Sequence, residues 1–435
     1  MLDINYIRTH KADVEYAIKS KAYEVDLDEL LRLSDERKSL TQQIEQLQQS
    51  RNANSAEIKR LGGKPDPKLI ASGKKIKADL AKLEDKLAKL EPTYTNLLKS
   101  VPNVPEKDVP YGLSEDENEV AEVIGEPTKF DFTPKNHYEL ASIRDWIDKE
   151  RAAKVTGARF AYIKGDLVKL QMAIINFVIN SLTNQSVIKK IIKDNHLTEL
   201  SDKPFTPVLP PLMLRTEMYD AMDRLEPRED RYKIDGEELW LQGSAEHVLG
   251  SMHAGEIFEE ANLPIRYLGY ATSFRQEAGT YGKDMEGIIR MHQFDKLEME
   301  SFSTKETSRK EHELFVAIQR WLLEQLELPY RVIRKCTFDI GKPDARGIDM
   351  EVWLPGQNKY RETHTADYMT DYQSRRLNTR VRRESGELEL VHTNDATAFA
   401  LGRIMVAIIE NYQTADNKVK IPTVLKPYLN NKEEL

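Results

Sequence analysis

The sequence predicts an α+β protein in which an antiparallel sheet is flanked by helices and preceded by an antiparallel two-helix coiled coil. Three observations support this fold class. Residues 27–99 carry apolar side chains near heptad spacing on two arms separated by a Gly/Pro turn. Several strand-like segments follow one another through short turns without a helix between them, which favours antiparallel pairing. Residues 166–193 and 306–327 have helical periodicity.

The predicted coiled coil has an outgoing and a return arm. The outgoing arm has near-heptad apolar residues at Leu33, Leu40, Ile44, Leu47, Ile58 and Leu61. The turn from Gly62 to Pro67 cannot remain helical, because it combines two glycines with two prolines. The return arm alternates by four and three at Ile76, Leu80, Leu83, Leu87, Leu90, Tyr94 and Leu97. Each arm is about 50 Å long at 1.5 Å per residue.

The return arm is rich in lysine. Its basic residues are Lys68, Lys74, Lys75, Lys77, Lys82, Lys86 and Lys89. A solvated coiled-coil flank is one interpretation, and the charge pattern alone favours it. The other is a lever that contacts an extended anionic partner. An isolated helical hairpin of this length buries only a narrow apolar seam. If the arm had a purely structural role, we would expect it to pack against a further surface.

Beyond the arm, the sequence predicts a hinge and a mixed α and β region. Prolines from Pro102 to Pro110 mark the hinge, and an acidic patch from Glu115 to Glu122 follows. Strand-like segments are 238–242, 264–275, 288–302, 330–340, 348–354, 359–372 and 387–393. The last long helix is predicted from about Ala396 to Tyr412. We therefore expect two domains, 1–108 and 109–435.

Composition excludes several classes of protein. The 435 residues are 40% hydrophobic and 31% charged, an ordinary soluble composition. Cys336 is the single cysteine, which excludes an internal disulfide framework and a multi-thiolate site, so no zinc is expected and a reducing compartment fits. The N-terminal segment lacks signal architecture and no apolar run reaches membrane-spanning length, so we expect a cytoplasmic protein. The net charge of −8 argues against wholesale coating of nucleic acid, but it allows a local basic surface.

Two charged stretches, Phe274 to Gly279 and Arg290 to Glu298, are the most informative part of the chain. Alternation along a strand places a set of charged and aromatic residues on one face: Arg275 and Glu277, and Arg290, His292, Phe294, Lys296 and Glu298. Joined through Gly279–Gly287, the two strands would form a hairpin. Such a face could hold a phosphate chain, a flat base and an amine.

Known phosphate-binding loops are missing from the sequence, which has neither a Gly-rich loop ending in Lys-Ser/Thr nor a Gly-x-Gly-x-x-Gly motif. If a nucleotide binds, arginine side chains must bind its phosphates in place of the backbone amides of such a loop. Arg275 could hold a phosphate through two parallel hydrogen bonds. Phe294 could stack on a purine, and Glu277 could accept from an exocyclic amine. The alternative is an exposed cross-strand ladder of Arg and Glu.

Arg403 lies in an apolar segment from Ala400 to Ile409. A buried arginine is costly unless it is paired or liganded, so it is either a ligand-binding residue or part of a structural salt bridge. Gly402 beside it allows close approach of a backbone or a ligand.

From Val208 to Arg403 the chain resembles the class II aminoacyl-tRNA synthetases, and over essentially its whole length it is similar to the seryl-tRNA synthetases. The resemblance rests on ordered strings: Ser244-Ala245-Glu246, the two charged stretches, Glu351-Val352-Trp353-Leu354-Pro355, Tyr360-Arg361-Glu362, Asp371-Tyr372-Gln373, Arg375-Arg376-Leu377-Asn378, Gly402-Arg403 and Glu410-Asn411-Tyr412-Gln413. So many ordered matches make chance agreement very improbable.

The resemblance implies a role for each site residue. Catalytic residues would be Arg275 at the α-phosphate, with Arg290 and Arg403 at the outer phosphates. ATP would be bound by Arg275, Gln276, Glu277, Met291, Phe294, Glu362, Thr363, His364, Thr365 and Arg403. Serine would be bound by Ser244, Ala245, Glu246, Glu298, Asp395 and Thr397. Glu362 and Thr365 would hold Mg²⁺.

The resemblance also implies the fold and the partners. Residues 1–108 would be a tRNA-binding domain carrying the arm at about 27–99, and 109–435 a class II catalytic domain with a synthetase-like antiparallel sheet. The expected activity is ATP-dependent activation of L-serine followed by transfer to serine tRNA, whose long extra arm would contact the coiled coil. A homodimer is expected through the Pro210-Pro211 region.

Some pocket residues depart from the family pattern. Ser244 stands where the family usually has threonine, which keeps the hydroxyl. Asp395 replaces an amide, and Ala396 removes the freedom of a glycine. The segment 363–369 replaces a run that is normally rich in Ser, Cys and Asn. For His364 we expect a hydrogen-bonded wall residue, because no second ligand cluster that would support a metal role lies nearby.

Two alternatives remain open. One is the same adenylation chemistry with another small amino acid or another acceptor, although homologues that load carrier proteins lack a long arm. The other is a catalytically inactive RNA-binding paralogue, which predicts loss of the phosphate-binding arginines. Arg275, Arg290 and Arg403 are all present.

Overall fold

The chain forms two compact units in the computed structural model, which describes residues 1–62, 66–278 and 287–435. The units are Met1–Val104 and Pro105–Leu435, whereas the sequence predicts the boundary at 108 and 109. Two predicted features, the centre of the arm's turn (63–65) and the loop joining the charged stretches (279–286), lie outside the described residues.

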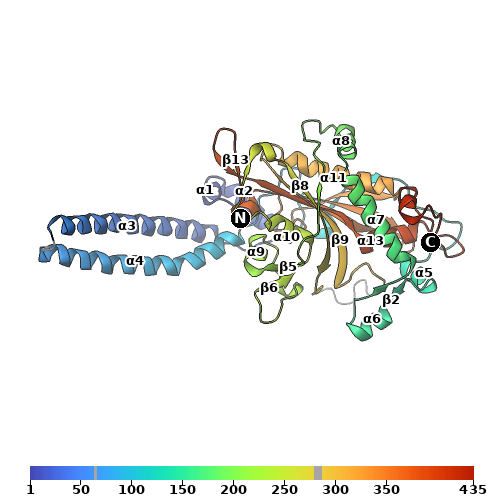
Figure 1. Cartoon of the computed structure of the whole chain (residues 1–435), viewed down its shortest axis with the longest axis horizontal. Coiled ribbons are helices and arrows are strands. Elements are labelled where there is room, and N and C mark those ends of the chain that lie inside the picture. Colours follow the sequence, from blue (N-terminus) through green and yellow to red (C-terminus); the bar gives the residue numbers. More distant parts are fainter. Residues whose placement is uncertain (63–65, 279–286) are drawn as a thin grey trace. The chain divides into compact units, whose positions relative to one another are not determined.

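The first unit is helical. It contains α1 (Ile4–Thr9), α2 (Lys11–Ser20), α3 (Leu27–Arg60) and α4 (Pro67–Ser100). The long helices α3 and α4 run side by side in opposite directions, as Figure 1 shows in blue. Each begins at an aspartate: the Asp26 carboxylate accepts from the Glu29 N–H, and the Asp66 carboxylate accepts from the Lys68 N–H. The predicted two-helix coiled coil is confirmed.

The seam between α3 and α4 combines apolar burial with polar bridges. Its buried apolar residues are Leu27, Leu30, Leu33, Leu40, Ile44, Leu80, Leu90, Tyr94 and Leu98. Arg37 donates to Glu91 at 2.8 Å, and its guanidinium lies 5.4 Å from the centre of the Tyr94 ring. Asn54 donates from Nδ2 to the Leu69 carbonyl oxygen at 3.0 Å. The polar residues at seam positions therefore bridge the two helices.

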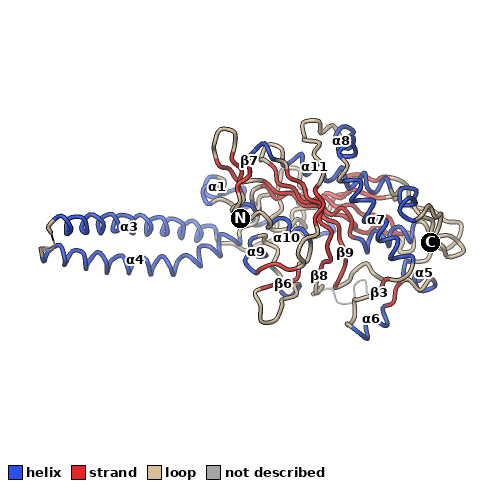
Figure 2. Tube along the Cα trace, in the orientation of Figure 1, coloured by secondary structure: helices blue, strands red, loops and turns tan. Residues whose placement is uncertain are grey.

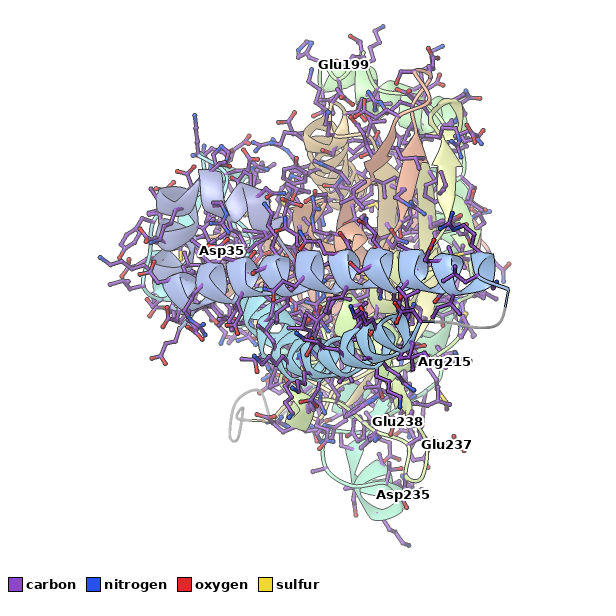
Figure 3. All side chains as sticks on the ribbon, turned by 90° about the vertical axis from the view of Figure 1, so that its left-hand side faces the viewer. Asp35, Glu199, Arg215, Asp235, Glu237 and Glu238 are labelled. Atoms are coloured by element: carbon purple, nitrogen blue, oxygen red, sulfur yellow. The ribbon has the colours of Figure 1, made fainter. Side chains whose placement is uncertain are left out.

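Most of the remaining surface of the arm is polar, although Leu61 and Ile70 are exposed as well; Figure 3 draws the side chains as sticks. Asp35, labelled in that figure, pairs with Arg8 of α1 at 2.7 Å. All seven lysines noted on the return arm are exposed. Among the described residues only one of the seven, Lys89, has an ion-pair partner, Asp85 at 2.7 Å. The arm thus carries uncompensated positive charge on its return helix.

The second unit is built on one eight-stranded sheet, whose strands are red in Figure 2. In spatial order the strands are β1 (Glu119–Ile124), β10 (Tyr330–Arg334), β11 (Arg346–Leu354), β12 (Lys359–Thr370), β15 (His392–Ala400), β9 (Gln293–Ser303), β8 (Ile265–Phe274) and β4 (Thr206–Val208). Every neighbouring pair is antiparallel except β4 with β8. The predicted α+β class with a largely antiparallel sheet is confirmed.

Smaller elements surround this sheet. Three short sheets contain β14 (Leu388–Leu390), β13 (Arg380–Arg382) and β7 (Ile257–Glu259); β2 (Ile147–Asp148) and β3 (Tyr162–Ile163); and β5 (Met213–Arg215) and β6 (Leu239–Leu241). The helices are α5 (His137–Ile143), α6 (Lys149–Val155), α7 (Asp166–Leu182), α8 (Gln185–Asp194), α9 (Thr216–Ala221), α10 (Ala245–Ser251), α11 (Ser308–Gln325), α12 (Tyr372–Leu377) and α13 (Leu401–Asn411). In the part of the chain that the structure describes, no helix has both the length and the hydropathy of a membrane span.

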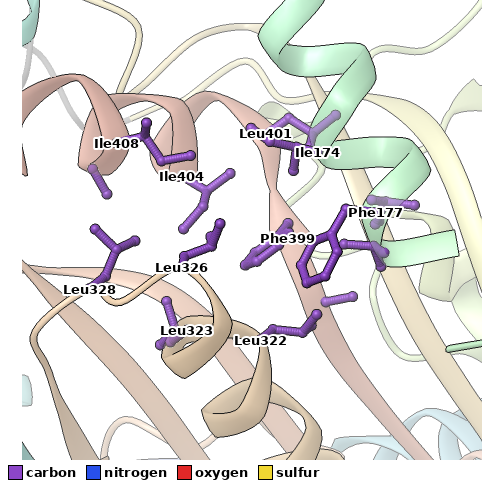
Figure 4. Packing of buried hydrophobic residues seen from close by; sticks show 14 of the residues in the cluster. Ile174, Phe177, Leu322, Leu323, Leu326, Leu328, Phe399, Leu401, Ile404 and Ile408 are labelled. Atoms are coloured by element: carbon purple, nitrogen blue, oxygen red, sulfur yellow. The ribbon is translucent and has the colours of Figure 1, made fainter. Parts of the chain in front are cut away.

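The main core lies on one face of the sheet. There α7, α11 and α13 pack together over the strands, with Phe177, Leu322, Phe399 and Ile404 interlocked at the centre of Figure 4. Strand alternation separates this face from the other: on β9, Leu297 and Met299 enter the core, so Lys296, Glu298 and Glu300 face the opposite side. That opposite side is covered in part by α10, through Ala245 and Leu249. The charged residues of β9 therefore face away from the apolar core.

Two element predictions are wrong. The last helix begins at Leu401, not near Ala396, because residues 392–400 form β15, a central strand hydrogen-bonded to β12 and to β9. The predicted strand 288–302 begins only at Gln293, so Arg290 and His292 lie beyond the ladder.

Two boundaries also differ. Residues 166–193 form two helices, and Asn184 caps the second by accepting from the Ser186 N–H. The predicted strand 330–340 ends at Arg334, because the N–H groups of Asp339 and Ile340 donate back to the Cys336 carbonyl in a turn.

Candidate active site

A cavity opens on the side of the sheet that faces away from the apolar core, between the ends of β8 and β9, the middle of β12 and the start of α13. It encloses about 650 Å³, a volume that includes space open to solvent. The lining residues are Arg275, Glu277, Ile288, Ile289, Arg290, Met291, Phe294, Lys296, Glu362, Thr363, Thr365, Thr397, Ala400, Gly402 and Arg403. All three arginines predicted to be catalytic are among them.

An aromatic ring and a cation form one wall of the cavity. The Arg275 guanidinium lies 5.4 Å from the centre of the Phe294 ring. Its Nε donates to the Gly243 carbonyl oxygen at 3.0 Å, which fixes the side chain. Because Arg275 follows the last residue of β8 and Phe294 lies next to the first residue of β9, the β8–β9 ladder brings them together. This wall can stack a flat base and hold an anion.

Arg290 and Glu277 lie close together, but not on one face of a strand hairpin as the sequence predicts. Both lie outside the ladder, so strand alternation does not place them on a common face. Their side chains form an ion pair at 2.5 Å. Glu277 has a φ of 53°, a left-handed backbone conformation that is uncommon for residues other than glycine and that often occurs at functional sites.

A second ion pair lies at the opposite wall. Arg403, in the first turn of α13, pairs with Glu362 of β12 at 2.7 Å and also donates to the Glu362 carbonyl oxygen at 3.0 Å. The neighbouring Glu362 carboxylate raises the pKa of Arg403, so the guanidinium is permanently charged. Of the two interpretations of Arg403, the salt bridge is present, and it is located in the wall of the cavity.

A β-bulge in β12 decides which residues of 362–365 face the cavity. The register passes from Met350 opposite His364 to Glu351 opposite Glu362, so Thr363 is the extra residue. Glu362, Thr363 and Thr365 consequently line the cavity, and His364 does not.

The His364 side chain lies within the core side of the sheet. It is fully buried, 5.3 Å from the Phe399 ring, and its Nδ1 is 2.8 Å from the Thr363 hydroxyl. Burial lowers the pKa of His364 to about 3, so the ring is neutral. His364 is therefore hydrogen-bonded, but neither the expected wall position nor the predicted contact with ATP has a counterpart in the cavity lining.

Three carboxylates gather beside the cavity, within 4.8 Å of one another: Glu246 of α10, Glu298 of β9 and Asp395 of β15. Ser244, which precedes α10, donates its hydroxyl to Glu298 at 3.3 Å. Lys296 donates to the Ser244 hydroxyl at 3.2 Å and pairs with Glu298. Because Lys296 and Thr397 also line the cavity, the acidic cluster and the cavity share a wall. The six predicted serine-binding residues thus come from three elements that converge.

Burial controls the charge of this acidic cluster. It raises the pKa of Glu298 to about 7, against the opposing effect of Lys296. Burial also raises the pKa of Asp395 well above its usual range. Glu246 differs, because Arg224, His247 and Lys296 together outweigh burial and hold its pKa well below the ordinary value. The cluster therefore holds one carboxylate that is firmly ionised and one that titrates near neutrality.

Sequence reasoning misplaces some residues and misses others. Gln276 is exposed, and its amide donates to the Arg231 carbonyl oxygen at 2.8 Å, outside the cavity lining. Strand alternation places Lys296 on the correct face but assigns it no role. Ile288 and Ile289 line the cavity but precede β9, and their apolar side chains do not suggest a binding role in the sequence. Arg224 is missed entirely, since no motif surrounds it.

Comparison with known protein families gives two matches that together span most of the chain. Residues 1–105 match the seryl-tRNA synthetase N-terminal domain. Residues 230–412 match the class II tRNA synthetase core domain of the G, H, P, S and T enzymes.

Full-length relatives are similar at moderate identity. The serine–tRNA ligase of Thermodesulfovibrio yellowstonii is 38% identical, with 99% of each chain covered. That of Nitrosopumilus maritimus is 36% identical over the whole of both chains. Among solved structures, the seryl-tRNA synthetase of Pyrococcus horikoshii complexed with ATP has a TM-score of 0.87 and 35% identity, covering 100% of this chain and 99% of that one. The chain belongs to the seryl-tRNA synthetase family, the serine–tRNA ligases of class II.

Proposed function

We propose that the cavity binds ATP, that the adjoining acidic cluster binds L-serine, and that the two together make seryl-adenylate for transfer to serine tRNA. The observation that carries this proposal is the shared wall, where Lys296 and Thr397 line the cavity beside Glu298. It brings a site rich in cations, suited to phosphates, next to a site rich in carboxylates, suited to an ammonium group.

On the ATP side, Phe294 stacks the adenine and Arg275 holds the α-phosphate. Met291 lines the adenine slot, and Glu277 accepts from the exocyclic amine. Arg290 and Arg403 hold the outer phosphates. Support comes from the cation that already lies over the Phe294 ring and from three arginines that line one cavity. Arg290 and Arg403 each contact a glutamate, so each guanidinium exchanges this partner for phosphate when ATP binds.

Glu362 and Thr365 are suited to hold Mg²⁺. Both line the cavity and offer a carboxylate and a hydroxyl oxygen, the hard donors that this ion prefers. When bound with ATP, the ion supplies positive charge to the phosphates. The chain's own contribution is to place these two oxygens beside Arg403.

The chemistry requires no nucleophilic side chain. An oxygen of the serine carboxylate attacks the α-phosphorus, the bond to the bridging oxygen breaks, and pyrophosphate leaves. In the second step a terminal ribose hydroxyl of tRNA attacks the carbonyl carbon of seryl-adenylate, and AMP leaves. Catalysis comes from positioning and from neutralisation of the developing charge by Arg275, Arg290 and Arg403.

The helical arm and a second exposed segment account for the partners. The exposed lysines of α4, six of which have no ion-pair partner among the described residues, would contact phosphates of a long extra arm of tRNA. Leu209 and Met213 flank the Pro210-Pro211 pair and are 80% and 45% exposed. Such apolar exposure supports a homodimer through this segment.

The test of the function is amino-acid-dependent ATP–pyrophosphate exchange with each of the twenty amino acids. We expect exchange with serine alone. Exchange with another amino acid instead would overturn the assignment of the substrate. No exchange with any amino acid, from a chain that binds tRNA, would favour the inactive RNA-binding paralogue.

The titration of Glu298 predicts how serine binding depends on pH. The ionised carboxylate binds an ammonium group much more strongly than the neutral acid does, because the hydrogen bond is then charge-assisted. Because the pKa of Glu298 is about 7, the ionised fraction rises between pH 6 and pH 8. The KM for serine in the exchange reaction should fall about tenfold over this range, following that fraction. The KM for ATP, measured in parallel, separates this effect from titration of ATP itself, and a serine KM that stays flat would contradict the role given to Glu298.

A further inference from the structure

Arg224 is a buried cation beside the acidic cluster, brought there by a sharp turn at the end of α9. Asp223, just before it, has a φ of 59°, and the Arg224 N–H donates to the Tyr219 carbonyl oxygen at 3.4 Å. The side chain of Arg224 is 16% exposed. Its own carbonyl oxygen accepts from Nε of Arg231 at 3.1 Å, so the backbone of this turn is fixed from both sides.

The guanidinium of Arg224 contacts three carboxylates. Its Nε lies 2.9 Å from Glu246, and one terminal nitrogen lies 3.1 Å from Asp344 and 3.5 Å from Asp395. Asp344 is itself anchored, because its other oxygen accepts from the Gly341 N–H at 2.9 Å. Among the described residues, Arg224 is the one cation that pairs with both Glu246 and Asp395.

The sheet explains why such a cation is needed. On β15, Asp395 lies directly opposite Glu300 of β9 and Asp367 of β12. All three carboxyl groups are buried. Like charges directly opposite one another on a sheet destabilise it, and a buried charge without a partner is costly. Burial raises the pKa of Asp395, so its carboxyl group is largely protonated, and the ionised Glu246 is the charge that Arg224 compensates. Without Arg224, Glu246 would lose its main reason to stay ionised, and Asp395 would lose a hydrogen-bonding cation 3.5 Å away.

We propose that Arg224 is the positioning residue of the amino-acid pocket. It holds the Glu246 carboxylate ionised and oriented for the substrate ammonium group, and it draws the Asp395 carboxylate towards Asp344. The inference rests on the proposed function, since it takes Glu246 and Asp395 as residues of the serine pocket. Arg224 thereby gives a partner to an aspartate that stands at a position where the family usually has an amide.

A resident metal ion is the competing explanation for three carboxylates within 4.8 Å of one another. Each of the three already has a cationic partner: Arg224 pairs with Glu246 and Asp395, and Lys296 pairs with Glu298. Because Arg224 and Lys296 already neutralise part of the negative charge, the remaining charge suits the single positive charge of an ammonium group better than that of a divalent ion.

The test compares Arg224→Gln, Arg224→Lys and the double variant R224Q/D395N in ATP–pyrophosphate exchange. In Arg224→Gln the KM for serine should rise about tenfold or more while the KM for ATP stays within about twofold, because the variant removes the charge-assisted contact of Glu246 and touches no residue that lines the cavity. Arg224→Lys should recover part of the serine affinity, since lysine keeps the charge but not the fork. In the double variant the KM for serine should stay close to that of Arg224→Gln, because Asp395 is already largely neutral and an asparagine changes little of its charge.

Arg376→Gln is the matched control. Arg376 is also buried and pairs with two aspartates, Asp223 at 2.8 Å and Asp220 at 3.3 Å, but it contacts neither Glu246 nor Asp395. If Arg224→Gln keeps the parent KM for serine, or raises both KM values together as a general loss of structure would, the inference is wrong. Should Arg224→Gln not fold, Asp344→Asn tests the same network, with an expected rise of several-fold in the KM for serine. If the parent chain itself shows no exchange with serine, the proposed function fails; a normal parent with unaffected variants overturns only the role of Arg224.

Discussion

Replacement of Arg403 by alanine is expected to lower the kcat/KM of serine-dependent ATP–pyrophosphate exchange about a thousandfold, the scale of losing a preorganised charge at a transition state. The residue lines the cavity and pairs with Glu362 at 2.7 Å. Its removal takes away a cation for the outer phosphates and also leaves Glu362, the predicted Mg²⁺ ligand, without its main partner. Both effects act on the same charged step, so the loss should appear chiefly in kcat.

Arg331→Ala provides the control for this experiment. Arg331 is another arginine on the same sheet that pairs with a glutamate, Glu351, and its side chain is 32% exposed against 29% for Arg403. It stacks over Tyr360 and does not line the cavity. We expect this variant to keep its exchange activity within about twofold, as is usual for a surface ion pair. Retention of more than a tenth of the activity by Arg403→Ala would show that the arginine is not needed for phosphate chemistry.

Deletion of residues 35–95, with a short Gly-Ser linker between Ser34 and Asn96, should separate the two steps of the reaction. Exchange should stay near normal, because every residue that lines the cavity belongs to the unit Pro105–Leu435. Aminoacylation of serine tRNA should fall about a thousandfold, the order expected when several phosphate contacts are lost at moderate salt. The readouts are exchange and charging of the same preparation.

A charge variant distinguishes the lysines from the arm as a whole. Replacement of the seven exposed lysines of α4 by glutamine keeps the apolar seam and the bridge from Arg37 to Glu91. Charging should fall strongly and lose most of its salt dependence, since fewer counterions are released on binding. Full charging by the deletion variant would exclude the arm as the tRNA-binding element, and full charging by the lysine variant would show that the arm acts through other side chains.

Local patterns predict the parts of the fold that depend on local physics. The four-and-three spacing from Ile76 to Leu97 identifies the return helix, because a helix repeats nearly every 3.6 residues whatever surrounds it. The same logic fails for residues 392–400. Alanines and polar residues there carry no strand signal, and the segment is a strand because β12 and β9 supply hydrogen-bond partners on both sides.

The candidate site divides in the same way. The roles of Arg275, Phe294 and Arg403 in phosphate and base binding come from the resemblance to the family, since residue type alone leaves an exposed Arg/Glu ladder and a structural salt bridge open. All three residues line one cavity. The predicted hairpin face differs from the structure, because Arg290 and Glu277 form their ion pair beyond the end of the β8–β9 ladder and not on one face of a strand. His364 shows the opposite case, in which a bulge that the sequence does not signal turns a tempting residue away from the cavity.

By itself, the sequence determines that this protein has a helical arm, a largely antiparallel sheet and a family-specific set of arginines and glutamates. These features follow from the periodicity of apolar residues and from motifs whose residues lie close together in the sequence. Only the tertiary structure decides the charge of the acidic cluster formed by Glu246, Glu298 and Asp395. Arg224, Glu246, Asp344 and Asp395 are far apart in sequence, and their ion pairs exist because α9, α10 and β15 meet on one side of the sheet. Electrostatic interactions of this kind depend on distance and burial, which no local pattern encodes.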